Sequence, residues 1–222
     1  MDDTVLCELS ASAAVARMAS GELSAETYAT ALLARCGQGA HLNAFINLDA
    51  EKVLAQARSA DAYRAAGKPL GPLHGLPVPV KDSINTADYP TTGGTNALRG
   101  FRPAADAAAV SLLRQGGAIV LGKTNLHELS FGWTSSNAAF GAVRNPHDPS
   151  RIPGGSSGGS TCRVGAPSLC DGIAVAHLGP VCRGTGAICR GAAGDAAELA
   201  GRRAMAAGVR ASLMLYAAQQ RR

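Results

Sequence analysis

Two apolar runs with a helical segment between them most constrain the fold of this chain. Leu76, Val78 and Val80 alternate with other residues, as one face of a strand would. Residues 118–122 form an uninterrupted apolar run, which is typical of a strand buried on both faces. Residues 106–115 carry apolar side chains at helical spacing. This order of strand, helix and strand predicts an α/β fold with a mixed, partly parallel sheet flanked by helices.

Helix caps extend this pattern along the chain. Ser24 and Asp49 are good N-caps, because their side-chain oxygens can accept hydrogen bonds from free N–H groups of the first helical turn. Asp106 is predicted to cap the helix that follows it, and Asn125 is predicted to start another short helix. The expected elements are helices at residues 24–37, 49–66 and 106–115, and strands at residues 42–48, 76–80 and 118–122.

Lys81 stands where the alternating apolar run ends. Pro77 and Pro79 lie within this run and predict a strand that cannot pair fully on both sides, since proline lacks an N–H. A lysine held at the end of a buried strand loses hydration, which lowers its pKa toward the range in which it can act as a base. The alternative is a surface lysine, which is the commonest environment of this residue.

A stretch rich in glycine and serine occupies residues 151–160, with the sequence RIPGGSSGGS. Glycine lets a backbone bend through positive φ and lets other groups approach closely. Serine supplies hydroxyls that can relay protons or attack a carbonyl carbon. Composition alone is typical of a flexible linker. The motifs that precede this stretch favour a catalytic role instead.

Four ordered motifs resemble those of the amidase signature family. They are GPLHGLPVPVKD at residues 71–82, GKTNLHEL at 122–129, FGAVRNP at 140–146 and GGSSGGS at 154–160. The resemblance covers about residues 5–160, which are identified as the N-terminal part of an amidase signature domain. Residues 126–135 look most like mandelamide and indoleacetamide hydrolases. The resemblance implies hydrolysis of a carboxylic amide to an acid and ammonia, without a cofactor.

The resemblance also assigns roles to single residues by matching motifs. Lys81 resembles the buried general base. Ser156 resembles the bridging serine, whose peptide bond to Gly155 is cis in the family. In this arrangement Ser156 relays a proton between the base and the nucleophile. Ser157 and Gly155 are expected to support this network.

Ser130 and Gly132 fall on a loop that lines the acyl pocket in relatives, and they are expected to contact substrate. His127 lies just before this loop. A lone histidine of this kind is more often a hydrogen-bonded structural residue than a catalytic one. No metal site is expected, because the cysteines at 162, 170, 182 and 189 lack C-x-x-C spacing and have no histidine at zinc-ligand spacing.

The family's nucleophilic serine lies further along the chain, in a motif whose N–H groups also form the oxyanion hole. The matching position here falls around residues 179–182, which read Gly-Pro-Val-Cys. No serine lies between Ser168 and Ser212, and no Gly-Gly-Ser follows Ser160. The sequence therefore predicts an amidase that is truncated and impaired, because losing the serine nucleophile removes several powers of ten in rate.

The composition changes at the same point. Residues 1–160 carry 13 Lys and Arg against 13 Asp and Glu, whereas residues 161–222 carry 8 Arg, no Lys and 3 Asp and Glu. Four of the six cysteines also lie after residue 160. These shifts predict that residues 161–222 form an aberrant Arg/Ala/Gly/Cys-rich tail that is frame-shifted, fused or poorly ordered.

The charge and the hydropathy exclude some classes of partner. The whole net charge of +5 lies in the tail, where arginines are scattered and Tyr216 is the single aromatic residue. That pattern argues against a nucleic-acid platform. The acidic start and the lack of an apolar run of about 18 residues argue against a signal peptide and a membrane span. A cytoplasmic protein with a small-molecule amide substrate is expected, and a homodimer is left open.

Two alternatives to the impaired amidase stay open. The first is the A-type subunit of a glutamine-dependent tRNA amidotransferase, which shares the same motifs through Ser160. The second is a non-catalytic α/β remnant that serves as an interaction protein.

Overall fold

The computed structural model describes residues 3–165, and the side chains of residues 5–161. The helices are α1 Asp3–Cys7, α2 Ala11–Ser20, α3 Ala25–Gln38, α4 Ala50–Ala65, α5 Ala108–Gln115 and α6 Gly158–Gly165, with short 3-10 helices η1 Ala40–Leu42, η2 Asn96–Leu98 and η3 Glu128–Ser130. The strands are β1 Phe45–Asn47, β2 Pro77–Lys81 and β3 Ile119–Thr124. Residues 166–222 of the predicted tail, which include the expected nucleophile position at 179–182, lie outside the described residues. α6 continues past the expected boundary at residue 160, and the division of the chain there stays a prediction.

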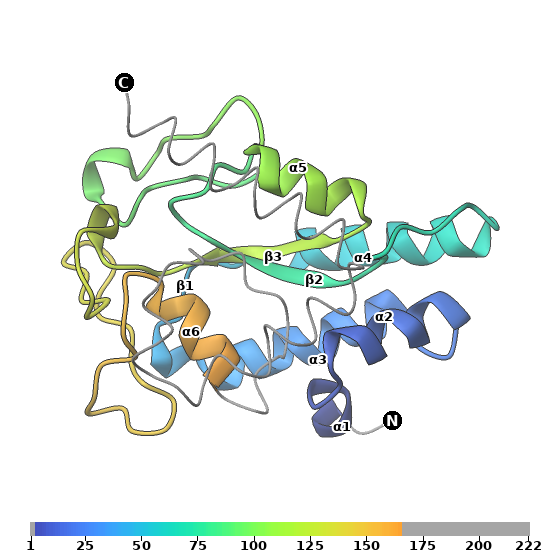
Figure 1. Ribbon diagram of the computed structural model, residues 1–222, viewed down its shortest axis with the longest axis horizontal. Helices are drawn as coiled ribbons and strands as arrows, with labels where there is room; N and C mark the ends of the chain where they lie inside the picture. The colour runs from blue at the N-terminus through green and yellow to red at the C-terminus, as the bar shows by residue number, and fades with distance from the viewer. Residues whose placement is uncertain (1–2, 166–222) are drawn as a thin grey trace.

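The three strands form one mixed sheet, which confirms the predicted fold class. The strand order is β1-β3-β2, with β1 antiparallel and β2 parallel to the central strand β3. All six residues of β3 are buried, which the apolar run predicts for residues 119–122 but not for Lys123 and Thr124. In Figure 1, α5 lies on one side of the sheet, and α3 and α6 lie on the other.

Two apolar clusters cover the strands. The larger cluster joins α1 to α4 with Val78, Ile119 and Leu121. The smaller one joins Val80, Tyr89, Val110 and Val120, and so packs α5 against the sheet. Burying apolar surface from both directions stabilises the sheet by roughly 25 cal/mol per Å² removed from water. The sheet therefore offers a rigid support for the residues at its end.

Among the described strands β2 lies at an edge of the sheet, and its unpaired edge carries prolines. The carbonyl of Leu76 and the N–H of Asp82, at its two ends, both bond to β3. Backbone groups alternate in direction along a strand, so the even-numbered residues face β3. The nitrogens of Pro77 and Pro79 therefore point away from β3, where their missing N–H groups cost no bond in this sheet. In the described part of the chain β2 pairs on one side alone, as the two prolines predict.

Two of the predicted helix caps are confirmed. The Ser24 hydroxyl accepts a hydrogen bond from the N–H of Thr27 at 3.0 Å, at the start of α3. The Asp49 carboxylate accepts one from the N–H of Lys52 at 3.0 Å, at the start of α4.

The predictions for Asp106 and Asn125 are wrong. α5 has Ala107 at its N-cap position without a side-chain cap. The Asp106 carboxylate instead accepts from the N–H of Ala87 at 2.8 Å and from Arg114 at 2.9 Å. The short helix predicted from Asn125 is instead the 3-10 helix η3, which begins at Glu128, and the Asn125 amide donates to the carbonyls of Asn43 at 3.1 Å and Gly141 at 3.2 Å. In both cases contacts with distant segments outcompete local capping.

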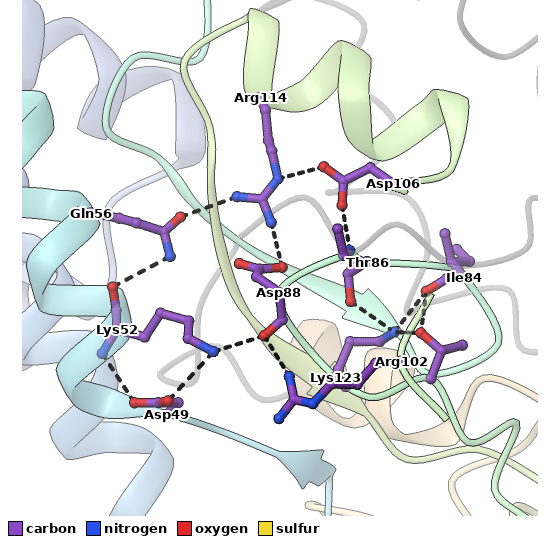
Figure 2. A network of polar contacts seen from close by, with 12 residues as sticks. Asp49, Lys52, Gln56, Ile84, Thr86, Asp88, Arg102, Asp106, Arg114 and Lys123 are labelled. Carbon is purple, nitrogen blue, oxygen red and sulfur yellow. Dashed lines mark hydrogen bonds and ion pairs between the residues drawn. The ribbon is translucent and has the colours of Figure 1, made fainter. Parts of the chain in front are cut away.

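The long segment between β2 and α5 is ordered by polar contacts, which Figure 2 shows. Arg114 of α5 binds Asp88 at 2.7 Å and Gln56 of α4 at 3.2 Å, in addition to Asp106. Lys52 of α4 donates to the carbonyl of Asp88 at 2.8 Å. These contacts fix the segment against both helices.

Candidate active site

Lys81 lies at the end of β2 and is buried, with 2% of its surface exposed. Burial removes water from the ammonium group and lowers the pKa of Lys81 from 10.5 to about 8. Lys81 is therefore not a surface lysine. At pH 8 about half of a group with this pKa is neutral, against about one in three hundred at the ordinary value.

Ser156 is the hydrogen-bond partner of Lys81. The Lys81 Nζ donates to the Ser156 Oγ at 2.9 Å, although 75 residues separate them. The peptide bond between Gly155 and Ser156 is cis. The structure thus brings together the two residues that the sequence motifs pair, at the distance that proton transfer requires.

A second serine holds the turn around Ser156. The buried Ser135 hydroxyl donates to the carbonyl of Gly154 at 2.7 Å and accepts from the N–H of Gly158 at 2.9 Å. A Cβ on Gly158 would lie 2.3 Å from the Ser135 Oγ, so this approach requires glycine. Ser135 was not among the residues singled out from the sequence. Its position within the resembling segment 126–135 was the only available signal.

His127 supports the other side of Ser156 through its backbone. Its N–H donates to the carbonyl of Ser156 at 2.9 Å. Its side-chain Nδ1 forms a hydrogen bond with the Thr134 hydroxyl at 3.2 Å, and its ring lies where a Cβ on Gly132 would be. These contacts agree with the structural interpretation of this histidine.

The remaining predicted site residues have less direct connections. Ser157 accepts two hydrogen bonds from Thr161 through its carbonyl, and no hydrogen bond joins its side chain to Lys81 or Ser156 among the described residues. Ser130 is exposed at the end of η3, two residues before Gly132. No hydrogen bond connects Ser130 to Lys81 within residues 5–161, and the substrate-binding roles of Ser130 and Gly132 stay predictions.

The neighbouring strand β3 carries a second buried lysine, Lys123, that the sequence did not reveal. Asp82 follows Lys81 directly and lies 3.5 Å from Lys123, and both side chains are fully buried. The two side chains have different partners: Lys81 binds Ser156, whereas the Asp82 carboxylate lies beside Thr92 and Lys123. Burial raises the pKa of Asp82 and lowers that of Lys123 to about 8, while their mutual attraction opposes both shifts.

Two classes of site are not found among the described residues. No group of three or more His, Cys, Asp or Glu side chains there could hold a metal ion. None of the helices in the same part of the chain is both long and apolar enough to span a bilayer.

The fold and the Lys81–Ser156 contact define a class of protein in which a buried lysine is hydrogen-bonded to a serine hydroxyl. The family model described as Amidase matches residues 28–174. This chain belongs to the amidase family.

Three relatives illustrate how far the similarity extends. The A-type subunit of glutamyl-tRNA(Gln) amidotransferase from Thermobifida fusca (strain YX) is 46% identical over 164 residues, which cover 73% of this chain and 33% of the relative. The peptide amidase from Stenotrophomonas maltophilia is 40% identical with a TM-score of 0.67, over 71% of this chain and 34% of that chain. A fatty acid amide hydrolase is 28% identical with a TM-score of 0.71, over 75% and 30%.

The chain spans about a third of the length of the curated relatives it matches. The family match ends at residue 174, short of the expected nucleophile position at 179–182. None of these three relatives is a mandelamide or indoleacetamide hydrolase, so that finer assignment stays a prediction.

Proposed function

We propose that this chain carries the base and the proton relay of an amidase that hydrolyses a carboxylic amide to an acid and ammonia. The single observation that carries this proposal is the 2.9 Å hydrogen bond between Lys81 and Ser156, beside a cis peptide bond. Family membership and the amide-hydrolysing relatives support it.

The proposed relay has two steps. Neutral Lys81 takes the proton of the Ser156 hydroxyl, and Ser156 in turn takes the proton of the nucleophile as that group attacks the amide carbon. Ammonia then leaves when the proton returns along the same path to the amide nitrogen. Water cleaves the acyl intermediate through the same relay, which releases the acid. The lowered pKa of Lys81 makes the first step efficient near pH 8.

Turnover by the chain itself is expected to be very low, because residues 179–182 hold no serine. Loss of the nucleophile and of oxyanion donors removes several powers of ten in rate. Labelling of the chain by an activated-serine probe therefore tests this expectation. Stoichiometric labelling that Ser156→Ala abolishes would contradict it.

A chimera tests the relay separately from the nucleophile. Residues 28–165 of this chain replace the matching segment of the Stenotrophomonas maltophilia peptide amidase, which supplies the rest of the fold. We expect ammonia release from amide substrates, and a loss of at least about a hundredfold in kcat for Lys81→Met and Ser156→Ala. Lys68→Met, at an exposed lysine, is the matched control and should leave kcat unchanged. A Lys81→Met chimera with full activity would overturn the proposal.

The A-type subunit of a tRNA-dependent amidotransferase is the second candidate. It is favoured by the 46% identity to the Thermobifida fusca protein, whose name refers to glutamyl-tRNA(Gln). The expected absence of a nucleic-acid partner is therefore not confirmed. Copurification with a tRNA-binding protein, together with ammonia release from glutamine, would favour this candidate over a free-standing amidase.

A non-catalytic interaction protein remains the third candidate. It predicts a stable monomer with cooperative unfolding, and a chimera that hydrolyses no amide. The expectations of a cytoplasmic location and of a small amide substrate belong to the enzymatic candidates.

A further inference from the structure

A buried ion pair lies next to the candidate site, because one of its members directly follows Lys81 in the chain. Asp82 and Lys123 are fully buried, and their charged atoms are 3.5 Å apart. Removing two charges from water is costly, and their attraction rarely returns much net stability. The hydrogen bonds of this pair connect it to the backbone segments on either side.

Lys123 has an oxygen for each of its three protons. Its Nζ donates to the carbonyl of Ile84 at 2.7 Å, the hydroxyl of Thr91 at 2.7 Å and the hydroxyl of Thr86 at 3.2 Å. Figure 2 shows this lysine reaching from β3 into the segment that follows β2. Lys123 thus holds both ends of the 84–91 segment.

Asp82 holds the turn that follows. Its Oδ2 accepts from the N–H of Thr92 at 3.0 Å and from the Thr92 hydroxyl, and its carbonyl accepts from the N–H of Gly93 at 3.0 Å. Its Oδ1 has no hydrogen bond among the described residues. Among the described residues Lys123 forms the ion pair with this oxygen, so the two residues depend on each other.

The turn is connected to Ser156 by two further hydrogen bonds. The N–H of Leu129 donates to the carbonyl of Gly93 at 2.7 Å. The N–H of His127, at the other end of the same short loop, donates to the carbonyl of Ser156 at 2.9 Å. A continuous path of short contacts therefore runs from Lys123 through Asp82 and Gly93 to Ser156.

We propose that Asp82 and Lys123 are positioning residues that hold the loop of residues 127–130 against Ser156. In this way they keep the Ser156 hydroxyl within hydrogen-bond distance of Lys81. This inference rests on the proposed function, because it assigns the pair to the same relay. Neither residue touches the reacting atoms. Their effect passes through the backbone of residues 92–93 and 127–129.

The chain offers a direct measurement, because Lys52, Lys68, Lys81 and Lys123 are its only lysines. NMR titration of 13Cε-labelled lysine in the full chain resolves Lys81 without any turnover. In the Lys123→Met variant the loop loosens and water reaches Lys81, so its titration midpoint should rise from about 8 by about one unit. The His127 amide should also lose protection from hydrogen exchange.

Arg114→Met is the matched control. Arg114 orders the same segment through Asp88 and Asp106, without a bond to residues 91–93 in the structure. It should lower stability and leave the Lys81 midpoint unchanged. Equal shifts in both variants would show a merely structural role and overturn the proposal, as would a folded Lys123→Met protein with an unchanged midpoint.

A double variant covers the case in which Lys123→Met does not fold. Asp82→Asn combined with Lys123→Met leaves no unpaired buried charge, and the same rise in the Lys81 midpoint is expected. An unchanged midpoint in the folded double variant rejects the proposal. The Lys81 midpoint tests the positioning role, and the chimera assay tests the proposed function. The chimera can be inactive while the midpoint shifts, or active while the midpoint stays unchanged, so the two proposals can fail separately.

Discussion

The burial of Lys81 should leave a signature in the pH dependence of folding. The pKa of Lys81 is about 8 in the folded protein, whereas the ordinary pKa of a lysine, which applies to the unfolded chain, is 10.5. Between these values the unfolded chain binds more protons than the folded one, so the free energy of unfolding rises with pH. Replacing Lys81 by Met removes this contribution.

The size of the effect follows from the two pKa values. Their difference corresponds to about 3 kcal/mol in total, of which about 2 kcal/mol is gained between pH 7 and pH 9.5. Because Lys81 is 2% exposed, solvent screening removes little of this amount. Lys123, whose pKa is also about 8, is present in both proteins, so its contribution cancels in the comparison.

Urea unfolding of both proteins at pH 7 and pH 9.5 measures the effect. The wild type should gain about 2 kcal/mol relative to Lys81→Met across this interval. Lys68→Met, at an exposed position, should follow the wild type at both pH values. A difference between wild type and Lys81→Met that stays constant within about 0.5 kcal/mol would refute the assignment of Lys81 as a buried base with a lowered pKa.

Two further substitutions test the turn and the helices. Gly158→Ala would place a Cβ 2.3 Å from the Ser135 Oγ and should cost about 1–3 kcal/mol in urea unfolding, whereas Gly37→Ala, with open space around it in α3, should stabilise by about 0.5–1 kcal/mol. A neutral Gly158→Ala would contradict the close approach of Ser135. Ser24→Ala should lower the free energy of unfolding by about 1 kcal/mol through loss of the bond to Thr27, and Ser20→Ala, at an exposed hydroxyl, should change it by less than half that amount.

The sequence predicted those features that depend on neighbours along the chain. Apolar spacing predicted the three strands and the long helices, although β1 is confined to Phe45–Asn47 within the predicted 42–48. Ser24 and Asp49 cap as expected because their partners lie three residues away. The pairing of Lys81 with Ser156 came from the motif resemblance, since nothing local connects residues 75 positions apart.

The contacts that the sequence missed join segments far apart in the chain. Asp106 binds Ala87 and Arg114 instead of capping α5, and Asn125 binds Asn43, 82 residues away. Asp82 and Lys123 are residue types that ordinarily lie at the surface. The pairing of β2 with β3 brings them together as a buried pair. Polar side chains of this kind take the partner that the fold brings near, and local patterns do not encode that choice.

The prolines on the free edge of β2 have a consequence for how copies of this chain meet. A strand that added to this edge would find the N–H groups of residues 77 and 79 missing, which leaves Lys81 as the sole donor among its odd-numbered residues. Edge-to-edge pairing, the usual route to β-aggregates, is therefore blocked beside the candidate site. Strand addition to the described part would therefore have to use another edge of the sheet.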